Sequence, residues 1–187
     1  MAQEGRPRGE VLRVGALESS LLAAACLLSY WVVVSLSALL PSSISSGDHI
    51  VGGAWSVIAT IIVSKSTYRE TAAAAVSRVY GTLVSMIICL IYLIFFPFHI
   101  WTMALLIGLS AFATALLRRP GDATAAAITT AVLIILSQLS PAHAWTQPIL
   151  RLGDTVVGAA VGVAAAWIGL RLLRLEPAAT ATAGRDG

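Results

Sequence analysis

The sequence predicts an all-α integral membrane protein with six transmembrane helices. Its 187 residues are 58% hydrophobic and only 11% charged, whereas a soluble domain has roughly a quarter charged residues. The apolar residues form six runs, most of them near the roughly 20 residues that a spanning helix needs. Lys and Arg lie mainly at the ends of these runs rather than in a patch interleaved with aromatic residues. A nucleic-acid partner is therefore excluded, and the lipid bilayer is the expected environment.

The spans are bounded by polar and turn-forming residues. A polar cytoplasmic tail, residues 1–18, precedes a membrane domain at residues 19–174, and a small-residue cytoplasmic tail follows at 175–187. The first run is too long for the apolar core of a signal peptide and lacks an A-x-A cleavage site, so it is taken as a retained span. The six expected spans are about 19–40, 49–64, 74–96, 100–117, 122–139 and 149–173.

Each later span has its own boundary signal. The second follows a Pro- and Ser-rich loop at 41–48, and the third follows a charged connection and an Ala-rich stretch. Pro97 separates the third span from the fourth, which ends before Arg118-Arg119-Pro120-Gly121. Asp122 or Thr124 can cap the fifth span, and a loop at 140–148 precedes the sixth.

The basic residues predict the orientation. All 12 Lys and Arg residues except Arg151 lie in the tails or in the connections after spans two and four. In this count Arg78 belongs to the connection before span three, and Arg171 and Arg174, at the inner end of span six, belong to the C-terminal tail. Positively charged connections stay in the cytoplasm, so both termini are expected there.

Two related pentads predict an inverted repeat. Arg78-Val-Tyr-Gly81-Thr82 opens the third span on the cytoplasmic side, and Arg151-Leu-Gly-Asp154-Thr155 opens the sixth on the outer side. Each half contains three spans, an odd number, so the second half would run upside down relative to the first. This arrangement occurs in many transporters.

The polar residues of these pentads are the candidate substrate-binding groups. Arg151, Asp154 and Thr155 share one helix face, and an arginine at a helix N-terminus needs a nearby carboxylate or anion. Either Asp154 anchors Arg151, or a substrate anion binds there. Polar side chains in the membrane often mark a substrate path. The candidates are Arg78, Thr82, Arg151, Asp154, Thr155 and, near the outer end of span five, Gln138.

Three glycines are expected to allow close helix packing: Gly81, Gly158 and Gly162, the last two in a G-x-x-x-G motif. The three histidines fall in outer loops and are interpreted as solvated residues rather than a metal site. Because no catalytic or metal-binding motif is found, no enzyme activity, cofactor or metal is expected.

At the following segments the chain resembles the fusaric acid resistance-like (FUSC) and aromatic acid exporter superfamily: Trp55-Ser-Val-Ile-Ala-Thr60, Arg78-Val-Tyr-Gly81-Thr82, Ile128-Thr129-Thr130 and Arg151-Leu-Gly-Asp154-Thr155-Val-Val-Gly158. The resemblance covers about residues 20–174. It implies a transporter or exporter of small organic acids, often aromatic ones, in the bacterial inner membrane.

Many members of this superfamily add a soluble region or a second membrane block. Because this chain stops shortly after span six, we expect a homo-oligomer, or a subunit with a periplasmic or cytoplasmic partner. The alternative is a non-transporting membrane scaffold or accessory subunit that assembles through its glycine-rich helix faces.

Overall fold

The computed structural model describes residues 8–39, 46–96, 100–118, 120–139 and 145–183, and the regular elements in these ranges are helical. They are α1 (Arg8–Ser37), α2 (Ser46–Val63), α3 (Tyr68–Phe95), α4 (Ile100–Leu116), the short 3-10 helix η1 (Pro120–Asp122), α5 (Ala123–Leu139) and α6 (Thr146–Ala183). The predicted all-α class with six long helices is confirmed. The ends of the predicted tails, residues 1–7 and 184–187, lie outside the described residues.

Three helices are long and apolar enough to cross a membrane. These segments are Gly15–Ser37 in α1, the whole of α3 and Thr146–Arg171 in α6. The other three helices, α2, α4 and α5, are apolar but only 18, 17 and 17 residues long. At 1.5 Å per residue they reach about 26 Å, slightly less than a hydrocarbon core of roughly 30 Å. The chain is a membrane protein.

The third helix begins earlier than its predicted span. The Thr67 side chain accepts a hydrogen bond from the backbone N–H of Glu70, which caps α3 six residues before the expected boundary at 74. A Thr followed three residues later by Glu is a common helix start. Arg78, expected near the membrane boundary, therefore lies ten residues inside α3, about 15 Å along its axis.

The first and last helices also extend beyond the predicted spans. Helix α1 begins at Arg8, within the expected N-terminal tail, and α6 continues to Ala183, within the expected C-terminal tail. Both extensions are rich in residues with high helix propensity, such as Ala, Leu, Arg and Glu. A helix can extend beyond the lipid into water. The ends of these helices therefore differ from the ends of their membrane-spanning segments.

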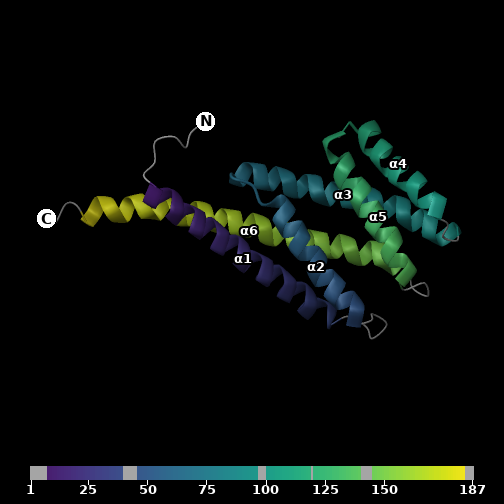
Figure 1. Cartoon of the computed structure of the whole chain (residues 1–187), viewed down its shortest axis with the longest axis horizontal. Coiled ribbons are helices and arrows are strands. Elements are labelled where there is room, and N and C mark those ends of the chain that lie inside the picture. Colours follow the sequence, from purple (N-terminus) through teal and green to yellow (C-terminus); the bar gives the residue numbers. More distant parts are fainter. Residues whose placement is uncertain (1–7, 40–45, 97–99, 119, 140–144, 184–187) are drawn as a thin grey trace.

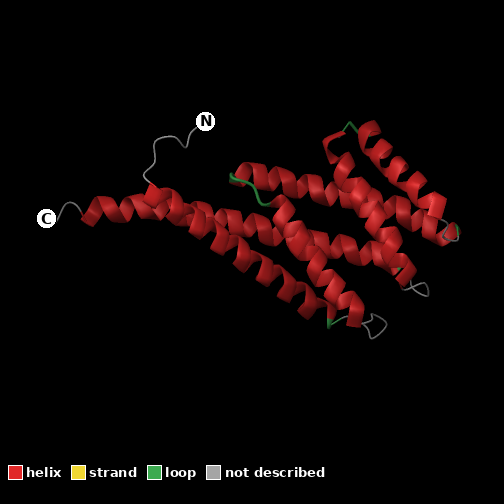
Figure 2. Cartoon of the chain, viewed as in Figure 1, coloured by secondary structure: helices red, strands yellow, loops and turns green. Residues whose placement is uncertain are grey.

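Helices α3 and α6 run alongside each other in opposite directions through the middle of the bundle (Figure 1). Helix α2 packs against α6 and α1, while α5 packs against α3 and α4. Figure 2 shows that the regular elements in the described part of the chain are helices. If α1, α2 and α3 are exchanged with α4, α5 and α6, the same pairs of helices remain neighbours. Two inverted repeats would produce such a pattern. The inverted repeat itself stays a prediction.

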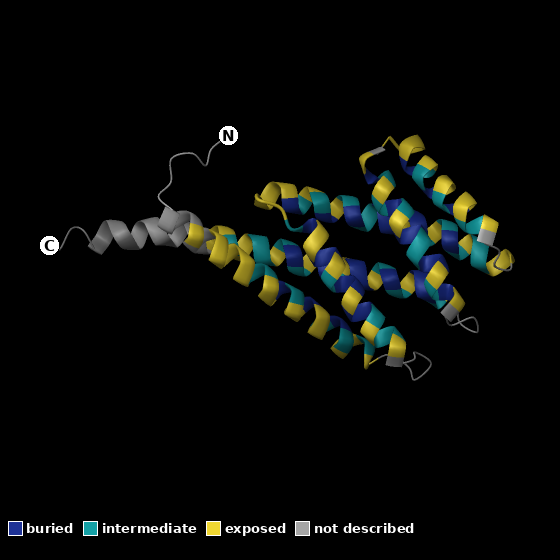
Figure 3. Ribbon diagram, in the orientation of Figure 1, coloured by how far each residue is buried: buried dark blue, intermediate teal, exposed yellow. Residues whose placement is uncertain are grey.

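The distribution of polar residues is inverted relative to a soluble protein. Large apolar side chains such as Leu27 and Trp101 are 74% and 84% exposed, as expected for surfaces that face lipid. Hydroxyl side chains gather inside, and those of Thr60, Ser85 and Thr155 are fully buried. Figure 3 places the buried residues where the helices cross. The bundle therefore hides its polar groups from the membrane.

The two ends of the bundle differ in charge. Helices that follow one another in the sequence alternate in direction (Figure 1), so the start of α3, the end of α4 and the C-terminal part of α6 belong to the same side of the bundle. This end, called the basic end below, contains Lys65, Arg69, Arg118 and Arg171. The opposite end contains the starts of α2 and α6.

Candidate functional site

Arg78 is a buried cation in the interior of the bundle. Only 2% of the residue is exposed, and its Nε and Nη2 atoms have no hydrogen-bond partner among the described residues. The guanidinium carbon lies 5.3 Å from the centroid of the Trp55 ring. This cation–π contact stabilises the charge without using its hydrogen-bond donors. The donors therefore remain available to an acceptor.

Trp55 connects Arg78 to the sixth helix. It lies halfway along α2, and its indole Nε1 donates a 2.9 Å hydrogen bond to Thr155 Oγ1. Thr155 in turn donates a 2.7 Å hydrogen bond to the backbone oxygen of Arg151. The two arginine pentads, expected near opposite faces of the membrane, are therefore linked through a single tryptophan.

Arg151 forms an ion pair with Asp154. Arg151 Nη1 lies 2.9 Å from Asp154 Oδ2, and the two residues are 1% and 9% exposed. The carboxylate packs against Gly52 of α2, where a Cβ atom would lie only 3.1 Å from Asp154 Oδ2. The structure contains the Arg151–Asp154 contact that the anchoring alternative requires. A carboxylate already compensates its charge.

The two arginines are consequently different in character. Arg151 has the carboxylate of Asp154 beside it, whereas Arg78 has the face of the Trp55 ring. Both guanidinium groups keep buried nitrogen atoms that have no hydrogen-bond partner among the described residues, so the counter-charge is what distinguishes them. A buried charge without a counter-ion is costly in a membrane and is usually connected with function. Of the sequence-predicted residues, Arg78 is thus the strongest candidate for binding an anion.

A comparison with known protein families identifies the class of protein to which the chain belongs. Residues 29–165 match the model of the family described as fusaric acid resistance protein-like. The chain belongs to the fusaric acid resistance protein-like family. No curated protein and no solved structure matched the chain. The family indicates a function in membrane transport or resistance, and its matched region includes Trp55, Arg78 and Asp154.

The three glycines that were expected to allow close helix packing lie at contacts between helices. A Cβ atom at Gly158 would meet the backbone oxygen of Ser56, and one at Gly162 would lie 2.5 Å from Val63 Cγ2. Gly81 faces α5, where its Cβ would lie 3.4 Å from the Ala126 nitrogen. Since α2 occupies the G-x-x-x-G face of α6, that face is not available for assembly with another chain.

The other predicted polar residues do not join the arrangement around the two arginines. Thr82 donates a 2.9 Å hydrogen bond to the backbone oxygen of Arg78, so its hydroxyl is already engaged by its own helix. Gln138 is exposed near the end of α5, and the structure does not bring it to the other candidates. His49 lies 2.6 Å from the Ser37 hydroxyl, a contact between α2 and α1.

Sequence reasoning missed two buried polar residues. Gln147, 2% exposed, donates a 2.7 Å hydrogen bond from Nε2 to Asp48 Oδ1, which joins the starts of α6 and α2. It lies four residues before Arg151, so helical spacing alone could have placed it on the same face. Asp122 is also buried and accepts a hydrogen bond from Ser77. Sequence reasoning took Asp122 for a helix cap only, because its partner on α3 lies 45 residues away.

Proposed function

We propose that the chain is a transporter that exports small organic acids, aromatic ones among them, and that Arg78 binds the carboxylate of its substrate. The observation behind this proposal is the buried Arg78 guanidinium, whose Nε and Nη2 have no partner among the described residues. A planar guanidinium can donate two parallel hydrogen bonds to one carboxylate. An organic anion would therefore satisfy a charge beside which the described part of the chain shows no paired carboxylate.

The positions of the polar contacts suggest how the path opens. At the end opposite the basic end, the Gln147–Asp48 hydrogen bond and the packing of Asp154 against Gly52 tie α6 to α2. At the basic end, a hollow of about 640 Å³ lies between α1, α6 and the connection from α2 to α3. It reaches Thr71, about two helical turns before Arg78 and on the same face of α3.

We therefore assign the structure to a state open toward the basic end and closed at the other. Transport would require the contacts between the starts of α2 and α6 to break while the hollow closes, as in alternating access. Assembly as a homo-oligomer, or with a periplasmic or cytoplasmic subunit, belongs to the same proposal and is tested by the mass of the purified complex.

Transport assays in vesicles of defined lipid test the role of Arg78. Replacing Arg78 with Gln should lower the flux of radiolabelled benzoate at least tenfold, because a hydrogen bond to a charged group contributes about 1.5–3 kcal/mol. Arg69→Gln is the matched control, since Arg69 is exposed at the start of α3, and its flux should equal that of the wild type. Equal flux in the wild type and Arg78→Gln, at equal protein content, would refute the assignment. No benzoate flux in any variant would favour the scaffold alternative.

Cysteine labelling in intact cells tests the orientation, with both termini in the cytoplasm of a bacterial inner-membrane protein. Cys26 and Cys89 are first replaced by alanine, and single cysteines are introduced at Trp145 and Arg118, which are exposed at opposite ends of the bundle. We expect an impermeant maleimide to label position 145 in intact cells and position 118 only after lysis, because basic connections remain inside. Labelling of position 118 in intact cells would reverse the orientation.

A further inference from the structure

A groove on the outside of the bundle has a lining suited to hydrocarbon. It lies between α3 and α6 and has a volume of about 790 Å³. Its walls consist of aliphatic and aromatic residues, among them Val76, Leu83, Val156 and Val163, and include no charged residue. The volume is within the range of small-molecule pockets, roughly 300–1,000 Å³.

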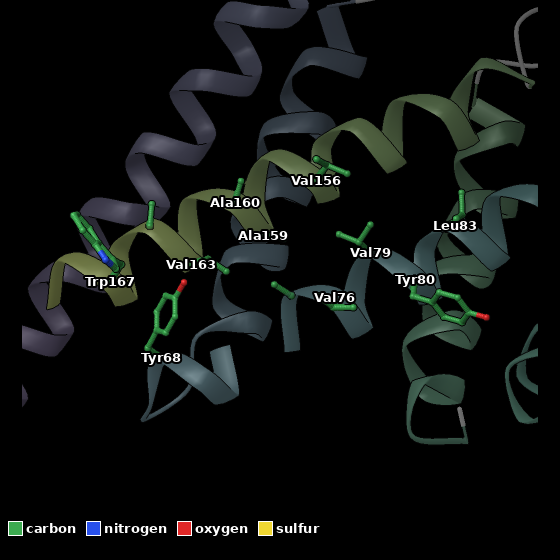
Figure 4. Close-up of a pocket in the computed structure, with 12 residues that line it drawn as sticks. Tyr68, Val76, Val79, Tyr80, Leu83, Val156, Ala159, Ala160, Val163 and Trp167 are labelled. Atoms are coloured by element: carbon green, nitrogen blue, oxygen red, sulfur yellow. The ribbon is translucent and has the colours of Figure 1, made fainter. Parts of the chain in front are cut away.

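One end of the groove differs from the rest. Tyr68 and Trp167 lie together at this end, and Leu83 lies at the other (Figure 4). Tyr and Trp are the residues that accumulate at membrane–water interfaces. The guanidinium of Arg171, one turn beyond Trp167 on α6, lies 4.7 Å from the centroid of the Trp167 ring. The groove therefore runs from an end with Tyr68, Trp167 and the nearby cation Arg171 into an aliphatic interior, and Tyr80 lies beside Leu83 at its other end (Figure 4).

We propose that this groove binds one acyl chain of an anionic phospholipid, with the phosphate beside Arg171 and the interfacial rings of Trp167 and Tyr68. The charge of Arg171 complements the phosphate, and the indole that it covers holds it at the mouth of the groove. The nearest carboxylate in sequence to Tyr68, Glu70, does not line this groove; it lines the adjoining hollow at the basic end, which shares Tyr68 with the groove.

A second copy of the chain is a less suitable occupant. Specific protein interfaces use polar groups around an apolar centre and bury roughly 1,200–2,000 Å². The groove walls offer no charged side chain that could fix the register of a partner helix. An acyl chain requires no such register, because it needs only apolar walls and a cation near its headgroup. The site lies outside the bundle, so it does not depend on the transport role of Arg78.

Photo-crosslinking of the wild-type protein tests the site directly. The protein is placed in nanodiscs of phosphatidylcholine that contain a small fraction of phosphatidylglycerol with a diazirine in its acyl chain. We expect adducts concentrated in peptides 75–83 and 156–167, and an excess of unlabelled phosphatidylglycerol should remove them. Adducts spread evenly over the exposed faces of α1 and α4 would overturn the proposal.

Two variants distinguish binding of the lipid's acyl chain from binding of its headgroup. Arg171→Gln should reduce crosslinking by phosphatidylglycerol about fivefold and leave that by phosphatidylcholine unchanged, because one basic residue near a membrane surface contributes about 1 kcal/mol toward anionic lipid. Ala160→Trp should fill the groove and abolish adducts there, whereas Ala104→Trp on the exposed surface of α4 should not. If Ala160→Trp instead converts a dimer into a monomer with unchanged adducts, a second copy occupies the groove and the proposal fails.

Discussion

Replacing Gly158 with alanine is expected to lower the free energy of unfolding by about 3 kcal/mol, and replacing it with leucine to prevent folding. A Cβ atom at this position would collide with the backbone oxygen of Ser56 and lie 2.9 Å from Ala59 Cβ. Backbone atoms cannot rotate away as a flexible side chain can, so α2 and α6 would have to separate. Overpacking of this kind typically costs about 1–3 kcal/mol, occasionally more.

Separation of α2 from α6 would also disturb the hydrogen bond from Thr60 to the Gly158 oxygen, 2.9 Å long. The measurement is unfolding of the detergent-solubilised protein by SDS, followed by circular dichroism. Gly153→Ala, on the same helix, is the matched control because nothing lies within 4 Å of its Cβ position. This control should gain about 0.5–1 kcal/mol, since alanine favours helix over glycine. Equal stability of the two variants would contradict the close packing of α2 on α6.

Removing the carboxylate of Asp154 is expected to cost about 3–5 kcal/mol of stability. The Asp154→Ala variant would leave the 1% exposed Arg151 without its counter-ion inside the bundle. Breaking a buried ion pair on one side is more costly than removing both partners, because a single uncompensated charge remains. SDS unfolding of the purified protein measures the loss.

The double variant Arg151→Met/Asp154→Ala provides the corresponding control. It should recover most of the lost stability, and a double-mutant cycle should give a favourable coupling energy between the two residues. Because Asp154 already compensates Arg151, benzoate flux through the double variant should stay close to that of the wild type. A stable double variant without flux would show that Arg151 contacts the substrate, and an Asp154→Ala protein as stable as the wild type would exclude the ion pair as an anchor.

Local sequence features predicted much of the site. The spacing of Arg151, Asp154 and Thr155 on one helix face is a local property, and the structure places them together there. The contact of Trp55 with Arg78 on one side and Thr155 on the other was not predictable. Those residues are 23 and 100 positions away from Trp55, and no periodicity within one helix reports which other helix it will face. Gln147 and Asp48 were missed for the same reason, since they are 99 residues apart.

The sequence by itself determined the class of the protein. Its composition and long apolar runs indicated helices in lipid, because a helix satisfies its own backbone hydrogen-bonding groups where no water is present. Its short motifs indicated the family. The tertiary structure alone decided which arginine is compensated. The helix start at Thr67 places Arg78 in the interior of α3, and the packing of α2, α3 and α6 places its guanidinium over an aromatic ring. Charge compensation depends on distances between helices, and these distances are set only when the bundle packs.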